Sequence, residues 1–170
     1  MGLYWEPCPG GARLLRLLGD TPCPAVPGTI EGLPVAELGP YCFADRPVRP
    51  GARRTGDDTH EITGNFVEEV TLPDTVRVLD SAAFYNCRRL RRLTAGTGEL
   101  TMGSDVFLNC FALETLVIRA RPEQATGLFA LVNNITEAVR AEFRPAGAAA
   151  PLAALWYPAY WEDIEETPAH

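Results

Sequence analysis

The sequence predicts a mainly β solenoid with short helical turns and a capping segment at each end. Three observations lead to this fold class, and all three lie in Val67–Ile118. Apolar residues recur at an offset of about 23 positions. A Phe, an Asn and a Cys recur at the same offset, and each repeat contains a run in which apolar and polar residues alternate. A regular period of this length is the signature of stacked repeats.

The repeat is visible as columns of equivalent residues. The apolar columns are Val67, Leu90 and Leu113; Val70, Leu93 and Leu116; and Leu72, Ala95 and Ile118. Phe84 matches Phe107, Asn86 matches Asn109, and Cys87 matches Cys110. Stacking neighbouring repeats buries such columns as one continuous core. We therefore expect the Phe and Cys columns to point inward, and the Asn-Cys pair to close the turn that leads to the next strand.

The alternating runs predict the exposed face of a parallel sheet. Successive residues of a strand point to opposite faces, so the polar residues between the buried apolar ones lie outside. The predicted outer positions, which are also the candidate partner-binding residues, are Glu69, Thr71, Arg92, Thr94, Thr115 and Val117. After the turn at Leu72–Asp74, Thr75–Leu79 alternates as a second short strand, with Val76 and Val78 expected inside.

These residues resemble a known family. The matching positions are Leu72-Pro73, Val76, Leu79, Ala83-Phe84, Asn86-Cys87, Leu90 and Leu93, followed by Phe107, Asn109-Cys110, Leu113 and Leu116. Together they resemble the BspA-like leucine-rich repeat, and Val26–Phe43 is similar to the entry unit of that family. The resemblance covers about residues 24–143. It implies a right-handed leucine-rich-repeat solenoid that binds other macromolecules, and it implies no reaction.

The chain divides into three parts. Residues 1–23 are predicted to form a capping hairpin, because the Pro/Gly cluster Pro7–Gly11 separates two apolar runs. A helical turn at Leu14–Leu18 remains an alternative, and Trp5 is expected to pack inside the cap. Residues 24–143 form the repeat array. Residues 144–170 form a linker, or short helix, and a tail rich in aromatic and acidic residues.

The array contains an insertion at residues 44–65. Pro, Gly, Arg and Asp dominate it, so we expect an exposed, mobile loop. Either it has no role, or its arginines meet an acidic partner; these are Arg46, Arg49, Arg53 and Arg54. Asp57, Asp58 and His60 are too few to predict a metal site.

The array is expected to end with a sheet strand at Ala138–Phe143. In the 23-residue register, Val139 and Ala141 would continue from Leu116 and Ile118, after an insertion at Arg121–Gly127. A helix over Gly127–Phe143 also fits the spacing. The tail aromatics either fold over the open end of the solenoid or form an exposed docking strip.

Composition and motifs exclude several functions. The net charge of −7 argues against a nucleic-acid partner, and no apolar run approaches 18 residues. The 5 cysteines lack zinc spacing, and no phosphate-binding glycine motif is present. We therefore predict no catalytic residue, no metal and no cofactor. Without a visible signal peptide the expected location is cytoplasmic if Met1 is the native start, and the cell surface if the sequence was trimmed.

The sequence therefore favours a non-enzymatic protein-binding or assembly module, with an unknown protein as its partner. The alternative is a fragment of a bacterial cell-surface adhesin. An enzyme would require a deep polar pocket with perturbed ionisable groups.

Overall fold

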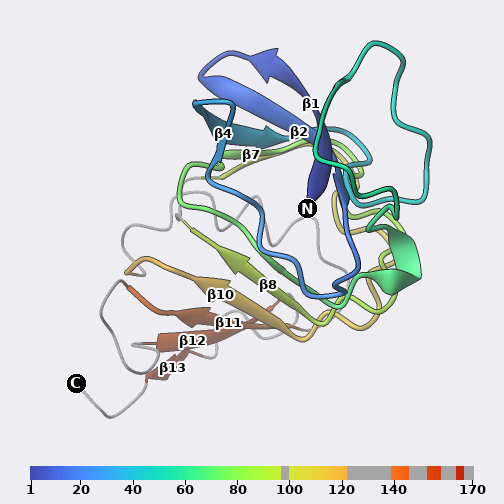
Figure 1. Ribbon diagram of the computed structural model, residues 1–170. Coiled ribbons are helices and arrows are strands. Elements are labelled where there is room, and N and C mark those ends of the chain that lie inside the picture. Colours follow the sequence, from blue (N-terminus) through green and yellow to red (C-terminus); the bar gives the residue numbers. More distant parts are fainter. Residues whose placement is uncertain (97–99, 122–138, 146–152, 158–163, 167–170) are drawn as a thin grey trace.

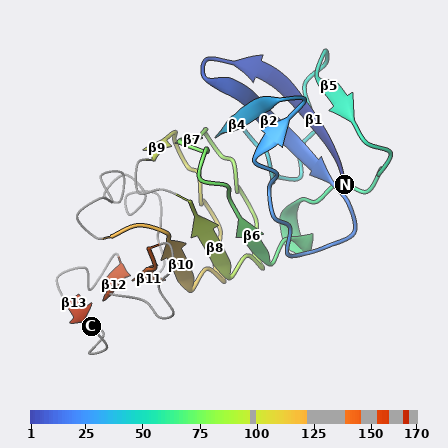
Figure 2. The same cartoon turned by 60° about the vertical axis from the view of Figure 1, so that its left-hand side comes forward.

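The computed structural model describes residues 1–96, 100–121, 139–145, 153–157 and 164–166. It is a mainly β solenoid, and its helical content among these residues is one short 3₁₀ turn, η1 (Gly64–Phe66). Two sheets lie on either side of the core, as Figures 1 and 2 show.

The first sheet, called the cap sheet, begins with an antiparallel hairpin. β1 (Gly2–Cys8) pairs with β2 (Gly11–Leu18), so the hairpin prediction is confirmed and the helical alternative is wrong. Gly11 is required at the hairpin turn, because a Cβ there would meet the carbonyl oxygen of Pro34 at 2.1 Å. Trp5 is buried with 1% exposure, as expected of a cap aromatic.

The cap sheet continues into the solenoid by parallel pairing. Its order is β5-β1-β2-β4-β7-β9, and β3 pairs with β4 outside this path. The added strands are β3 (Thr29–Ile30), β4 (Leu33–Leu38), β5 (Arg53–Thr55), β7 (Val78–Leu79) and β9 (Thr101–Met102).

The second sheet, called the repeat sheet, contains the alternating runs. Its strands are β6 (Glu69–Thr71), β8 (Arg92–Ala95), β10 (Thr115–Ile118), β11 (Val139–Phe143), β12 (Ala153–Tyr157) and β13 (Ile164–Glu166). The strands from β6 to β11 are parallel, whereas β12 and β13 are antiparallel additions.

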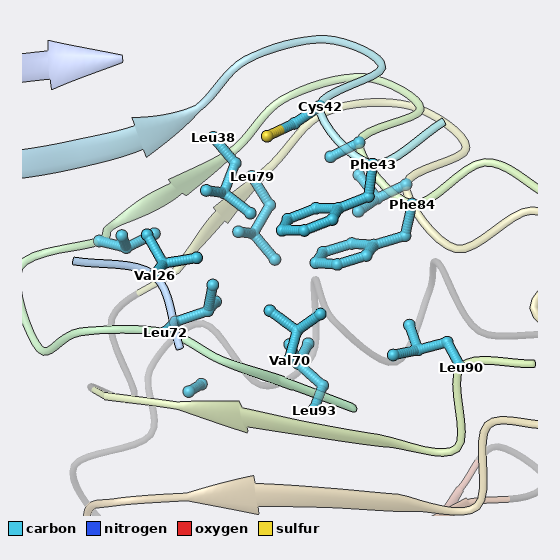
Figure 3. Close-up of a cluster of buried hydrophobic side chains, with 14 of the residues drawn as sticks. Val26, Leu38, Cys42, Phe43, Val70, Leu72, Leu79, Phe84, Leu90 and Leu93 are labelled. Carbon is cyan, nitrogen blue, oxygen red and sulfur yellow. The ribbon is translucent and has the colours of Figure 1, made fainter. Parts of the chain in front are cut away.

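The core lies between the two sheets, and the repeated columns fill it. Figure 3 shows Leu38 and Leu79 from the cap sheet facing Val70 and Leu93 from the repeat sheet. At one end of the core, Phe43, Phe84 and Phe107 form a ladder of nearly parallel rings, with centroids 5.0 and 5.4 Å apart. The predicted burial of the Phe and Cys columns is therefore confirmed.

The second short strand differs from the prediction. Val76 is buried, but Val78 is half-exposed and Leu79 is buried instead. The reason is that Val76 belongs to the turn, where its amide donates to the carbonyl of Pro73 at 3.2 Å. Strand alternation begins only at Val78, so it cannot be extended back to Val76.

The insertion at residues 44–65 is more ordered than a simple loop. β5 lies within it and pairs antiparallel with β1, so that Tyr4 is opposite Arg54. Ile62 is buried and its amide donates to the carbonyl of Leu17 at 3.0 Å. The prediction of exposure holds for all four arginines, Arg46, Arg49, Arg53 and Arg54, but the segment also completes the cap.

The last parallel strand is present, but its register differs from the prediction. Leu116 is opposite Ala141 and Ile118 is opposite Phe143, two residues beyond the expected partners. A shift of two preserves which side chains face the core, because the strand period is two. Residues 139–143 are a strand rather than a helix; the rest of that helical alternative, and most of the predicted insertion at Arg121–Gly127, lie outside the described residues.

Two antiparallel strands, β12 and β13, extend the repeat sheet beyond β11. β12 pairs with β11, and β13 pairs with β12, so the array ends in antiparallel strands. Most of the predicted linker lies outside the described residues, as do the side chains of the tail aromatics.

Candidate partner-binding face of the repeat sheet

The outer face of the repeat sheet carries two ladders of side chains, one residue per strand. The first ladder is Glu69, Arg92, Thr115 and Arg140; the second is Thr71, Thr94, Val117 and Glu142. Parallel pairing places each residue beside its equivalent on the next strand, about 4.8 Å away. The sequence-predicted residues are therefore brought together. Arg140 and Glu142 complete the ladders and were missed, although alternation along Val139–Phe143 could have found them.

Five of the six predicted residues are half-exposed, and Val117 is the exception. Val117 is 3% exposed, so the prediction that it faces solvent is wrong. It lies between Thr94 and Glu142 on the neighbouring strands, and Glu142 is itself 9% exposed. Flanking side chains in a ladder remove an apolar residue from water even on the outer face of a sheet. Val117 stabilises the face rather than offering a contact.

The charges of the face are unevenly paired. Glu69 forms an ion pair with Arg91 at 3.1 Å. Its carboxylate is therefore paired with the residue just before β8 rather than with Arg92, the first residue of that strand. Within the described part of the chain, Arg92 forms no ion pair. Glu142 is held between Arg140, at 2.5 Å, and Arg144, at 3.0 Å. Arg92 is thus a cation at the centre of the face, with Thr94 and Thr115 beside it.

The first edge of the repeat sheet is covered by the segment that leaves the cap. Thr71 donates its amide to Pro24 at 3.1 Å and accepts from Val26 at 2.8 Å. Cys23 lies at this edge. Burial is the main cause that raises the pKa of its thiol, and a hydrogen bond to Glu69 raises this pKa further. Because the backbone of β6 is already paired, a partner would meet the side chains of the face and not this edge.

Two of the three residues considered for metal binding have other contacts. Asp58 pairs with the N-terminal amine at 3.0 Å, and Nδ1 of His60 lies 2.8 Å from the carbonyl oxygen of Gly19. No group of three metal-binding side chains occurs among the described residues. All five cysteines are free thiols.

Cavities among the described residues lie away from the outer face. One, of about 450 Å³, is bounded by residues 47–52 together with Tyr4, Leu18, Thr59 and Glu61. Another, of about 460 Å³, lies beside the hairpin turn and is lined mainly by apolar groups, including Pro9, Pro34 and Val78. No helix in the described part of the chain is long and apolar enough to cross a membrane.

Comparison with solved structures identifies the same architecture in a bacterial protein. The leucine-rich repeat protein TpLRR of T. pallidum matches with a TM-score of 0.53 and 24% identity, over 69% of this chain and 48% of that one. A leucine-rich cell surface protein from Faecalibacterium prausnitzii matches with a TM-score of 0.45 and 20% identity, over 68% of this chain and 35% of that one. The chain thus spans about half of the first protein and about a third of the second.

The comparison with curated proteins found no match. The family comparison agrees with the repeat columns and with the paired ladders described above. It matches the BspA type leucine-rich repeat region over residues 61–139, with 6 copies. Residues 61–139 of this chain are a BspA type leucine-rich repeat region.

Proposed function

We propose that this protein is a protein-binding module, and that the outer face of its repeat sheet receives the partner. The observation that carries the proposal is the pair of side-chain ladders, because they align chemically different groups at fixed spacing across four strands. The proposed contact residues are Glu69, Thr71, Arg92, Thr94, Thr115 and Arg140. Arg140 takes the place that the sequence assigned to Val117, which is buried.

The chemistry of the face supports a polar contact centred on Arg92. Its guanidinium has five donors in a planar fork and suits a carboxylate or a row of carbonyl oxygens on a partner. Thr94 and Thr115 add hydroxyls that both donate and accept. Each strand contributes one residue to each ladder, so contacts add along the array, while the paired backbone keeps their spacing fixed.

The test is affinity capture with a charge-reversed face. Arg92→Glu combined with Glu69→Arg reverses both charges while leaving the net charge unchanged. The matched control combines Arg89→Glu with Asp20→Arg, which reverses two exposed charges away from the face. Capture from cytosolic and cell-surface fractions of the source organism, done separately, also distinguishes the two locations that the sequence left open.

The expected result is a partner that binds the unaltered protein and the control, and whose binding to the face variant falls at least about tenfold, as removal of one central interface contact does. A partner that binds both variants equally would move the contact elsewhere. A partner lost from both variants would indicate non-specific charge attraction. Equal thermal unfolding of the three proteins would exclude misfolding as the cause.

A further inference from the structure

Aromatic rings and arginines gather at the surface of the turns that also contain the phenylalanine ladder. We call this group the stacked patch; its side chains are those of Tyr41, Arg46, Tyr85, Arg88 and Phe111. Tyr41 is 37% exposed and Phe111 is 55% exposed, so both rings keep much of their area in water. Aromatic residues and Arg are enriched in protein interfaces relative to the rest of a protein surface.

Both arginines of the patch lie over aromatic rings. The guanidinium carbon of Arg46 is 4.9 Å from the ring centroid of Tyr41 and 5.5 Å from that of Tyr85. These two rings pack edge to face, with centroids 6.4 Å apart. The guanidinium carbon of Arg88 is 5.9 Å from the ring centroid of Phe111, on the following turn. Attraction to a ring face positions a guanidinium without using its N–H donors.

The two cations of the patch are not compensated by acids. Arg46 and Arg88 are exposed, and neither forms an ion pair or a side-chain hydrogen bond with any described residue. Asp45 precedes Arg46 in the chain but forms no ion pair with it among these residues. The patch is therefore locally basic on a chain whose net charge is −7.

We propose that the stacked patch binds an extended acidic segment of a partner protein. Charge complementarity selects an acidic occupant, because each guanidinium offers its planar fork of donors to a carboxylate. Arg46 and Arg88 extend from different turns, so the segment must present more than one carboxylate. Tyr41 and Phe111 supply apolar area for the parts of the segment between the charges.

This surface is distinct from the face proposed above as the main contact. None of its five residues belongs to a strand of the repeat sheet, and Tyr41, Tyr85 and Phe111 lie in turns. Arg92 at the centre of that face also suits a carboxylate, so it is the main competitor for an acidic segment. The experiment must therefore separate the two arginine sites.

The experiment is isothermal titration calorimetry of the full chain with a synthetic peptide of about twelve residues that alternates Glu and Thr. We expect saturable binding at low salt with a dissociation constant on the order of 10⁻⁴ M, as for a short flexible peptide held by a few charge-assisted contacts. The matched peptide with Gln in place of Glu should not bind. No saturation by the Glu peptide up to about 1 mM would overturn the proposal.

Charge-neutralised variants locate the peptide. Arg46→Gln combined with Arg88→Gln should weaken binding at least about tenfold. The control combines Arg53→Gln with Arg54→Gln, which removes the same charge from two exposed arginines that also lie over rings, those of Trp5 and Tyr4. The control should bind like the unaltered protein. Equal losses in the two variants would refute a site at the patch and indicate non-specific attraction.

Phe111→Ala tests whether the ring beneath Arg88 contributes. Loss of an exposed cation–π contact should weaken peptide binding about two- to fivefold. Both arginine charges remain in this variant, so a loss of binding cannot arise from net charge. Unchanged affinity would refute recognition by stacked arginines. Equal thermal unfolding of all these proteins would exclude misfolding as the cause.

Two further titrations exclude other occupants and the other site. A thymidylate oligonucleotide of matched length should bind more weakly than the Glu peptide; equal or tighter binding would overturn the choice of an acidic protein segment. The variant Arg92→Glu with Glu69→Arg should bind the peptide like the unaltered protein. Loss of the peptide from this variant alone would overturn the proposal and place the carboxylate site on the repeat sheet. Failure of the peptide to bind at all leaves the capture experiment on that sheet unaffected.

Discussion

Asn109 donates a hydrogen bond from its amide nitrogen to the side-chain oxygen of Asn86, one repeat earlier, at 2.7 Å. Both residues have a positive φ, of 61° for Asn86 and 65° for Asn109. Asn is among the few residues other than Gly that adopt this left-handed conformation readily. The Asn column of the repeat therefore has two functions: it allows the sharp turn and it bonds neighbouring turns to each other.

Replacing Asn109 separates these two functions. Asn109→Gly keeps the backbone conformation and loses the hydrogen bond, so we expect the free energy of unfolding to fall by about 1 kcal/mol. Asn109→Ala loses the same hydrogen bond and, unlike Gly, holds a Cβ in the left-handed region without the polar group that lets Asn tolerate it, so its fall should be about 1–2 kcal/mol larger than that of Asn109→Gly. Urea unfolding measures both values. Equal values for the two variants would show that the positive φ is not maintained.

Arg16 is a buried connection between the cap and the first repeat. It is 2% exposed, and it donates to the carbonyl oxygens of Cys42 at 2.8 Å, and of Tyr41 and Ala44, each at 2.9 Å. Its ion pair with Glu61, at 2.7 Å, lies at the surface, where Glu61 is 48% exposed. We therefore expect the hydrogen bonds from Arg16 to the three carbonyl oxygens to stabilise the fold more than its ion pair with Glu61 does.

Arg16→Met should destabilise the protein by about 3–5 kcal/mol, because a fully paired buried network loses its donor. Glu61→Gln should cost less than about 1 kcal/mol, as expected for an exposed partner of an ion pair. Thermal unfolding of both variants checks the difference. A large loss for Glu61→Gln would instead place the stabilisation in the ion pair.

The central ring of the phenylalanine ladder has neighbours on both faces. Phe84→Ala should lower the free energy of unfolding by about 3–5 kcal/mol, because it leaves a cavity between Phe43 and Phe107. Phe111 is 55% exposed, and Phe111→Ala should change stability by less than about 0.5 kcal/mol. Urea unfolding of the pair tests whether burial in the ladder, rather than loss of an aromatic ring, decides the cost.

The buried thiols predict a loss of stability at high pH. Burial raises the pKa of Cys42 and of Cys110 from 9.0 to about 12. The folded state therefore keeps protons that the unfolded state releases, so this contribution is complete below pH 9 and decreases between pH 9 and 12. Each thiol should remove up to about 1.4 kcal/mol per pH unit in that window.

Urea unfolding at several pH values measures this slope. The variant Cys42→Ala with Cys110→Ala is expected to be less stable at pH 7 but to have a shallower decline above pH 9. Other groups that titrate there are common to both proteins and cancel in the comparison. Parallel declines would show that these two thiols do not retain their protons.

Much of the fold follows directly from the repeat. Each turn has the same neighbours above and below, so an apolar column at constant spacing must be buried as a column. This reasoning correctly placed the Phe and Cys columns in the core and Glu69, Arg92 and Thr115 in one outer ladder. It failed where neighbours are no longer equivalent: Val117 has Glu142 beside it, and β11 is shifted by two residues.

The sequence by itself determined the period, the inward and outward faces of the strands and most of the candidate binding ladder. These features depend on the alternation of apolar and polar residues within each strand, and on the stacking of equivalent residues of neighbouring repeats. Only the tertiary structure decided that β5 in the insertion pairs with β1, and that Arg16 is buried against three carbonyl oxygens. Those contacts join segments that share no repeat, and no periodic pattern records which groups meet across such distances along the chain.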